Sequence, residues 1–400
     1  MLELLLPPPV DPLWDLTEAY GADARPERLN LVLGVYRDQT GGTPVMAAVR
    51  EAEMRLAERS ASKEYRGLSG NAAFNRAMLS LVLGSGSGGG AAERAVAVQT
   101  VAGSGALRLL ADLICRTRPG TTVWISDPAY VNHRPILEAA GLTVRTYGWL
   151  DAEGRFDTAG MLRDLGGARR DDVVLLQGCC HNPTGVDPSA QAWEAVAELA
   201  AERGWVPFVD LAYHGLGDGL EADLAATRLL AERVPEMLVA ISCSKNFGLY
   251  SDRTGCAVVL GASRQSLRHV ETALQNAART LYSMPPEHGA AVVTAILDDD
   301  GLRALWRAEL DGMRARIEDN RRGLAAELTA LGWGAQADVL ARQKGMFSML
   351  PLTARQMLRL RSRFAIYGTT AGRINIAGLP AHRVPCLAQG VAAVLGEGAE

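Results

Sequence analysis

From about residue 96 onward, short apolar runs alternate with longer helical runs, and this rhythm constrains the fold more than any other feature of the chain. The apolar runs read AVAVQTVAG, TVWISDP, DVVLLQGCC, WVPFVD, LVAISCS and CAVVLGA, and segments such as ALRLLADLICR and QAWEAVAELAAERG separate them. Strands that are apolar along their whole length are typical of a parallel sheet covered by helices on both faces. We therefore expect an α/β fold with a mostly parallel sheet between helices.

The rhythm changes after about residue 300, where one long helical stretch precedes the short strand-like runs GMFSML and RINIAG. A chain of 400 residues is long enough for two lobes. We expect residues 44–312 to form a large domain and residues 313–400 a small α+β domain. Residues 1–43 are expected to form an N-terminal arm and part of that small domain.

Composition excludes several classes of function. The net charge is −4 and the basic residues are scattered, so we expect no nucleic-acid partner and no binding to an acidic membrane. The N-terminus has no basic start, and no apolar run reaches the length of a membrane span, which favours the cytoplasm. The six cysteines form no CxxC pair, so neither a metal site nor a disulfide is expected.

The stretch ISCSKNFGLYSDRTG places Lys245 just beyond an apolar run, three residues after Ser242 and eight before Arg253. Ligands of such sheets collect beyond the carboxyl ends of the strands. An amine there can lose water, lower its pKa and attack a carbonyl, while the arginine supplies a cation for a phosphate. By itself, a lysine in a loop of small residues is more often a solvated side chain.

Two other strand ends carry polar groups that suit an aromatic cofactor ring. Asp210 ends WVPFVD, and a carboxylate there needs a cation such as a protonated pyridine nitrogen. Tyr213 follows in DLAYHG and could bind a ring oxygen. Asn182, in GCCHNPTG, could donate to the same oxygen, or could simply form an Asx turn.

Three further positions fit the same interpretation less specifically. Gly103 and Ser104 immediately precede a helical run, so their free N–H groups could hold a phosphate, although ordinary helix capping explains them as well. Tyr130 could cover a flat ring or lie in the core. His133 could support a carboxylate or be a structural histidine.

Two arginines are candidates for binding substrate carboxylates. Arg373 in AGRINIAG begins a strand-like run, and Arg279 lies in ARTLYSMPPEHG. Either one alone is more often a surface residue. Gly34, within an apolar run, indicates close approach by a ligand or by another part of the backbone.

Taken together and in this order, HNPTG, DLAY, SCSKNFGLYSDRTG and AGRINIAG resemble the class I pyridoxal-phosphate aminotransferases, specifically the aspartate and aromatic subgroup. The resemblance runs nearly end to end and includes GVYRDQTGGTP, KEYRGLSG and YSMPPEHGA. It implies the fold type I architecture of these transferases and pyridoxal 5'-phosphate as cofactor. It also implies ping-pong transamination, through a Lys245 aldimine, between aspartate or an aromatic amino acid and a 2-oxo acid such as 2-oxoglutarate.

The resemblance also assigns a role to each candidate residue. Asp210, supported by His133, would pair with the ring nitrogen; Asn182 and Tyr213 would bind the ring oxygen; Gly103, Ser104, Ser242, Arg253 and Tyr65 of the partner subunit would hold the phosphate; Arg373, Gly34 and Asn182 would bind the α-carboxylate; and Arg279 of the partner subunit would bind a distal carboxylate. Lys245 would carry the proton between substrate and cofactor. Because the site is then shared, a homodimer is expected.

Several positions depart from the usual pattern of the aspartate enzymes. Tyr130 replaces a tryptophan, Ser104 a threonine and Gln177 a histidine, while Met284 replaces an asparagine close to Arg279. A flexible apolar side chain beside a carboxylate site eases the entry of an aromatic ring. We therefore expect dual use of dicarboxylate and aromatic substrates, with Tyr130 still covering the ring.

Two other functions remain open at the level of sequence. β-Lyases and decarboxylases share this fold and cofactor, and only their products differ. A non-catalytic cofactor-binding regulator would need an additional helix-turn-helix module and a basic surface, and this sequence shows neither.

Overall fold

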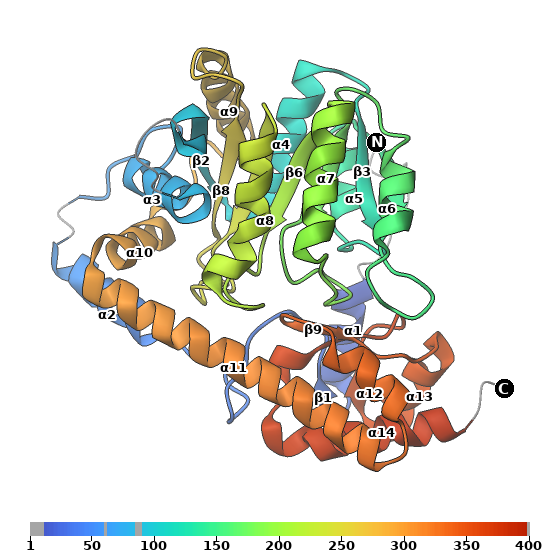
Figure 1. Ribbon diagram of the computed structural model, residues 1–400. Coiled ribbons are helices and arrows are strands. Elements are labelled where there is room, and N and C mark those ends of the chain that lie inside the picture. The colour runs from blue at the N-terminus through green and yellow to red at the C-terminus, as the bar shows by residue number, and fades with distance from the viewer. Residues whose placement is uncertain (1–11, 60–61, 85–89, 398–400) are drawn as a thin grey trace, which may run out of the picture. The chain divides into compact units, whose positions relative to one another are not determined.

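The computed structural model describes residues 12–59, 62–84 and 90–397, and the chain divides into two compact units (Figure 1). One unit is Pro44–Ala315, and the other combines Met1–Thr43 with Arg316–Glu400. Residues 1–11 of the expected N-terminal arm lie outside the described residues. The next part of that arm forms a helix, α1 (Pro12–Ala22).

A seven-stranded sheet forms the centre of the larger unit, in the order β2-β8-β7-β6-β5-β3-β4. Its strands are β2 (Ala95–Val101), β3 (Thr122–Asp127), β4 (Thr143–Gly148), β5 (Val173–Gln177), β6 (Val206–Leu211), β7 (Met237–Ser242) and β8 (Thr254–Leu260). β8 runs antiparallel to both of its neighbours, and the other pairings are parallel. The expected mostly parallel sheet is confirmed.

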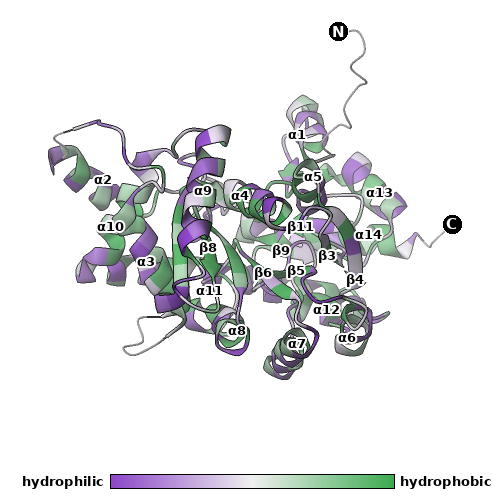
Figure 2. Ribbon diagram, turned by 90° about the horizontal axis from the view of Figure 1, so that it is seen from above, coloured by the Kyte–Doolittle hydropathy of each residue, from purple (hydrophilic) through white to green (hydrophobic). Residues whose placement is uncertain are grey.

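Helices cover both faces of this sheet, as Figures 1 and 2 show from two directions. One face carries α4 (Ala102–Thr117), α5 (His133–Ala139) and α9 (Arg268–Leu281). The other carries α6 (Thr158–Leu165), α7 (Ala190–Arg203) and α8 (Leu220–Arg233). Because both faces are covered, every residue of β5, β7 and β8 is buried, which explains why these strands are apolar except at one end of each.

A second group of helices packs beyond β2. It contains α2 (Ala47–Arg59), α3 (Ala72–Leu83), α10 (Glu287–Asp298) and the first half of α11 (Asp300–Ala330). α3 packs on β2, and α10 packs on α2 and α3. The Asn71 side chain accepts hydrogen bonds from the N–H groups of Ala73 and Phe74 and so begins α3 where the sequence changes from loop to apolar helix.

The smaller unit contains two short sheets and several helices. β1 (Leu29–Asn30) pairs in parallel with β10 (Ile366–Tyr367), and β9 (Phe347–Met349) pairs antiparallel with β11 (Arg373–Asn375). The helices are α1, the second half of α11, α12 (Gly334–Ala341), α13 (Ala354–Phe364) and α14 (Val384–Gly396). A capping box between Thr353 and Gln356 begins α13.

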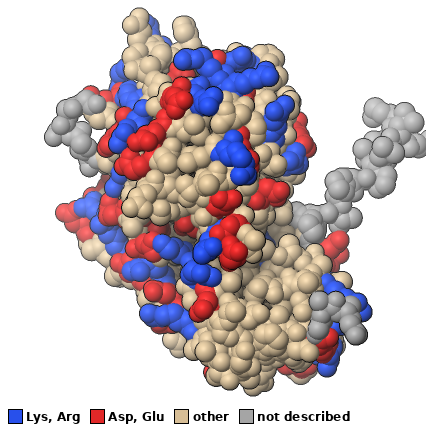
Figure 3. Space-filling model, turned by 45° about the vertical axis from the view of Figure 1, so that its right-hand side comes forward, with Lys and Arg blue, Asp and Glu red and all other residues tan. Residues whose placement is uncertain are grey.

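The surface carries both signs of charge. On the face seen in Figure 3, Lys and Arg side chains are interspersed with Asp and Glu side chains. Within the described ranges, no helix combines the length and the apolar character that crossing a bilayer requires.

Candidate active site

The sheet brings together the ends of three neighbouring parallel strands, β5, β6 and β7. Asp210 lies in β6, where it pairs with Gln177 of β5 and Ala240 of β7. Asn182 lies five residues beyond the end of β5, and Lys245 lies three residues beyond the end of β7. Because parallel strands end at one edge of a sheet, segments far apart in the sequence meet there.

Lys245 is half-buried, and its amine lies 5.0 Å from the centre of the Tyr213 ring. Loss of water around the amine lowers its pKa to about 8; the Asp210 carboxylate opposes this shift, and the Arg253 guanidinium adds to it. A lysine with a pKa near 8 is neutral in a useful fraction of molecules at neutral pH. The neutral amine is the form that attacks a carbonyl.

The loop that carries Lys245 is anchored by contacts that the sequence analysis missed. The indole Nε1 of Trp306 in α11 donates to the carbonyl oxygen of Asn246 at 2.8 Å. The Trp306 ring also stacks on Phe247, with ring centres 4.4 Å apart and planes 3° from parallel. On its other side, the Asn246 amide lies 2.8 Å from the imidazole Nε2 of His214. No local pattern links residues 246 and 306, so only the folded chain reveals this support.

Asp210 meets His133 inside the protein. The His133 Nε2 lies 2.8 Å from the Asp210 carboxylate, and both side chains are buried. Tyr130, three residues before His133, packs its ring edge-on against the imidazole, with ring centres 5.2 Å apart. A buried carboxylate held by a histidine can accept a further cationic partner.

Asn182 and Tyr213 also lie together. The Asn182 amide nitrogen donates to the Tyr213 hydroxyl at 3.0 Å, and both residues are buried. Two adjacent polar groups beside the Lys245 amine can bind one oxygen atom of a flat ring. The structure therefore places Lys245, Tyr213 and Asn182 in one cluster.

The first turn of α4 packs against the ends of β7 and β8. The helix begins at Ala102, so Gly103 and Ser104 lie inside its first turn, whereas the sequence analysis placed them just before the helix. A Cβ added to Gly103 would approach the Ser242 Cβ to 3.0 Å, which explains the glycine. The Ala102 N–H donates to the Arg253 carbonyl at 2.9 Å. Unpaired N–H groups of a first helical turn, close to a serine and an arginine, suit a phosphate.

Arg373 and Gly34 lie in the smaller unit, and both lie close to the Phe347 ring. The Arg373 guanidinium is buried, donates to the Val32 carbonyl at 2.7 Å and lies 4.5 Å from the centre of the Phe347 ring. A Cβ on Gly34 would come within 2.6 Å of the same ring. A larger residue at position 34 would displace the Phe347 ring that packs against Arg373.

Tyr65 and Arg279, the two residues expected to act in the partner's site, are both exposed in this chain. Tyr65, in the loop between α2 and α3, exposes 92% of its surface. Arg279, in the last turn of α9, is also exposed.

One buried group of side chains has the composition of a metal site. Cys179, Cys180 and Asp223 bring their ligand atoms within 4.8 Å of one another. The Asp223 carboxylate, however, already accepts N–H groups from Gly215, Gly217 and Asp218 at 2.8–2.9 Å. Hydrogen bonding to Cys180 and burial raise the pKa of the Cys179 thiol well above its usual value, which disfavours the thiolate that binds metals. The group is therefore better explained as a brace for the loop at 215–218.

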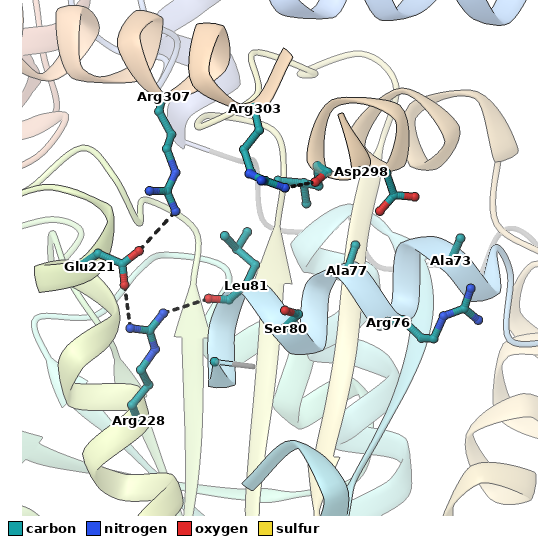
Figure 4. Close-up of a pocket in the computed structure, with 12 residues that line it drawn as sticks. Ala73, Arg76, Ala77, Ser80, Leu81, Glu221, Arg228, Asp298, Arg303 and Arg307 are labelled. Carbon is teal, nitrogen blue, oxygen red and sulfur yellow. Dashed lines mark hydrogen bonds and ion pairs between the residues drawn. The ribbon is translucent and has the colours of Figure 1, made fainter. Parts of the chain in front are cut away.

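A cavity of about 760 Å³ lies between α3, α8, α10 and α11 (Figure 4). Three arginines that line it form hydrogen bonds with carbonyls at helix ends or ion pairs with a glutamate. Arg228 donates to the carbonyls of Leu81 and Val82 in the last turn of α3, and Arg303 donates to the Leu297 carbonyl near the end of α10. Arg228 and Arg307 both pair with Glu221. None of the residues that the sequence singled out lines this cavity.

Comparisons with known proteins point to one family over the whole chain. The family model "Aminotransferase class I and II" matches residues 26–391. A tyrosine aminotransferase from Rhizobium meliloti is 48% identical over 377 residues, which cover 92% of this chain and 94% of that protein. An aspartate aminotransferase from Escherichia coli is 40% identical over 99% of this chain and 100% of its own length. An aromatic-amino-acid aminotransferase from Burkholderia pseudomallei, solved covalently bound to pyridoxal phosphate, superposes with a TM-score of 0.96 at 40% identity, over 99% of both chains.

Proposed function

This chain belongs to the class I and II aminotransferases. We propose how its own residues bind the cofactor and move a proton. It is an aspartate and aromatic amino acid aminotransferase that uses pyridoxal phosphate. The observation that carries the assignment of roles is the half-buried Lys245, with its lowered pKa, beside Tyr213 and within the field of Asp210.

The side chains around Lys245 fit pyridoxal phosphate. The first turn of α4, where Gly103 leaves room against Ser242, offers free N–H groups to a phosphate. The buried pair of His133 and Asp210 offers a carboxylate to a pyridine nitrogen. When bound, the cofactor acts as an electron sink that stabilises negative charge at the substrate Cα.

We propose one role for each part of the cofactor site. The residues are Asp210 with His133 for the ring nitrogen, Asn182 and Tyr213 for the ring oxygen, Tyr130 for the ring face, and Gly103, Ser104, Ser242 and Arg253 for the phosphate. Asp210 would keep the nitrogen protonated, because a positive charge stabilises a buried carboxylate beside it. Asn182 and Tyr213, which lie together beside Lys245, would hold the ring oxygen by hydrogen bonds.

Lys245 both holds the cofactor and moves the proton. The free amine would take a proton from the substrate Cα and deliver it to the cofactor, which requires a pKa close to the working pH. The value of about 8 meets this requirement. Lys245→Ala is expected to retain pyridoxal phosphate by its phosphate and ring contacts, yet to lose nearly all transamination, measured as 2-oxo acid formed. Full activity in this variant would exclude the assignment.

Arg373 is the proposed ligand of the substrate α-carboxylate. Its guanidinium is fixed by the Val32 carbonyl and by the Phe347 ring, so little rotamer freedom is lost on binding. Gly34 supports this arrangement by leaving room for Phe347. An arginine held in this way presents two parallel N–H groups to a carboxylate.

Met284 is proposed to widen the choice of substrate. It follows α9 five residues after Arg279, the residue proposed to bind a distal carboxylate. An apolar side chain gives a dicarboxylate no hydrogen bond but accepts a ring. We expect Met284→Asn to shift the ratio of kcat/KM for aspartate over phenylalanine about tenfold toward aspartate, the size of one polar contact.

The matching experiment compares aspartate, glutamate, phenylalanine, tyrosine and tryptophan as donors, with 2-oxoglutarate as acceptor. The unaltered enzyme is expected to use members of both classes. Efficient turnover of only one class, with none of the other detectable, would contradict dual use. An unchanged ratio in Met284→Asn would remove Met284 from the explanation.

We further propose that the enzyme is a homodimer in which Tyr65 and Arg279 complete the partner's site. Both residues are exposed in the single chain, as residues that act in a partner's site would be. Mixing Lys245→Ala subunits with Arg279→Ala subunits tests the sharing. A mixed dimer then holds one site with both residues intact, so aspartate turnover should return. Mixed dimers that form without any recovery would show that each chain supplies its own Arg279.

The cytoplasm is the proposed compartment. All six cysteines are free, and four of them are buried. Free thiols are usual in proteins of reducing compartments. Fractionation of cells that express the protein would test this location directly.

A further inference from the structure

The last residue of β5, Gln177, uses its carboxamide as a clamp on the main chain of Asn182. Its Nε2 donates to the Asn182 carbonyl at 2.8 Å, and its Oε1 accepts from the Asn182 N–H at 2.8 Å. The side chain is 4% exposed. Two hydrogen bonds from one planar group fix both the position and the orientation of the peptide that they hold.

This clamp acts on a residue whose side chain must point in one direction. The Asn182 amide donates to the Tyr213 hydroxyl at 3.0 Å, and the Lys245 amine lies over the Tyr213 ring. Gln177 itself is aligned with Asp210 in the adjacent strand. A change in the Asn182 backbone would therefore move the hydrogen-bonding groups beside Lys245, while Asp210 would stay in place.

The rest of this loop is held by other residues. The Asp187 carboxylate accepts the N–H groups of Cys180 and His181, and the His181 imidazole lies 2.9 Å from the Ser126 hydroxyl. Removing the Gln177 amide should therefore leave the loop folded and loosen mainly Asn182. Different residues therefore hold the fold of this loop and set the orientation of the Asn182 side chain.

A carboxamide suits this task better than an imidazole. Its N–H and C=O groups lie side by side and can pair with the C=O and N–H of one residue, whereas the two nitrogens of an imidazole point away from each other. Unlike histidine, glutamine keeps the same donor and acceptor at every working pH.

We propose that Gln177 is a positioning residue of the transaminase site, which sets the aim of the Asn182 amide toward the oxygen of the bound cofactor ring. The inference rests on the proposed function, because it needs Asn182 to bind that oxygen. Its effect is on the protonation of the bound cofactor and on turnover, not on folding alone.

The test compares holoenzymes carrying Gln177→Met, Gln177→His and Ser126→Ala. Methionine keeps the volume and loses both hydrogen bonds, and histidine can restore only one of them. Ser126→Ala is the matched control, because it removes a buried hydrogen bond from the neighbouring residue, His181. The readouts are the pH titration of the bound cofactor's visible absorption, kcat and KM for the amino donor, and the thermal midpoint.

Gln177→Met should shift the midpoint of the absorption titration by about one pH unit and lower kcat about tenfold, since small misplacements of catalytic groups reduce rates strongly. The titration midpoint and kcat of Gln177→His should lie between those of Gln177→Met and the unaltered enzyme. If Gln177→Met does not fold, Gln177→His alone still tests the proposal. Ser126→Ala should lower the thermal midpoint and leave the titration unchanged. An unchanged titration and kcat in the folded Gln177 variants would overturn the inference. If the unaltered enzyme neither binds pyridoxal phosphate nor transaminates, the proposed function itself fails.

Discussion

Replacing Lys245 by methionine should weaken the rise in the free energy of unfolding of the cofactor-free protein with increasing pH. In the folded protein the pKa of Lys245 falls from 10.5 to about 8, mainly because burial removes water from the ammonium. The unfolded chain keeps its proton up to about pH 10. Between these two pH values the unfolded state binds more protons than the folded state, so the free energy of unfolding rises with pH.

The magnitude follows from the size of this shift. A change of 10.5 − 8, about 2.5 units at 1.36 kcal/mol each, destabilises the folded protein by about 3 kcal/mol at any pH below the folded pKa. The destabilisation is relieved as the lysine loses its proton, by about 1 kcal/mol between pH 7 and pH 9. Methionine fills nearly the same volume and carries no charge, so the variant lacks this dependence.

The assay is urea denaturation of both cofactor-free proteins at two pH values and one protein concentration, because a dimer's apparent stability depends on concentration. The unaltered protein should gain about 1 kcal/mol relative to Lys245→Met between about pH 7 and pH 9. Lys63→Met, at an exposed position in a loop, is the control and should show no such gain. A difference between unaltered protein and Lys245→Met that stays constant with pH would refute the lowered pKa.

Two further predictions concern groups that support the lysine. Asp210→Asn should lower kcat at least a hundredfold, because an amide cannot keep a pyridine nitrogen protonated, whereas Asp210→Glu should lose less; equal losses in steady-state assays would argue against the role of the charge. Trp306→Phe should keep the stacked ring but lose the hydrogen bond to the Asn246 carbonyl, and so reduce the free energy of unfolding by about 1 kcal/mol. Trp205→Phe is its control, because the Trp205 indole N–H has no hydrogen-bond partner among the described residues; the same loss in both variants would remove the special role of Trp306.

The fold class could be predicted from the strands that are buried on both faces. β5, β7 and β8 are apolar except for one polar residue at an end of each, because helices cover both of their sides. The edge strand β4 was not predicted, because Thr143, Arg145 and Thr146 are polar and exposed and leave no continuous apolar run in TVRTYG. Local patterns also could not predict that β8 runs antiparallel between β2 and β7, since strand direction depends on how the chain returns to the sheet.

The pattern of apolar runs along the chain is enough to identify the residues at the strand ends. Lys245, Asp210 and Asn182 each follow or end an apolar run, and parallel strands bring such positions to one edge. Their roles were inferred from ordered motifs and stay predictions until variants are measured.

How these groups are held and charged depends on contacts that form when the chain folds. The pKa of Lys245 depends on the water excluded around it and on the charges of Asp210 and Arg253, neither of which is a local property of the sequence. The anchoring of the lysine loop by Trp306 joins residues 60 positions apart. The clamp of Gln177 on Asn182 spans only five residues, yet it exists because the chain folds back over the end of β5. Hydrogen bonds and desolvation depend on distances in space, so they become defined when the sheet and its loops are assembled.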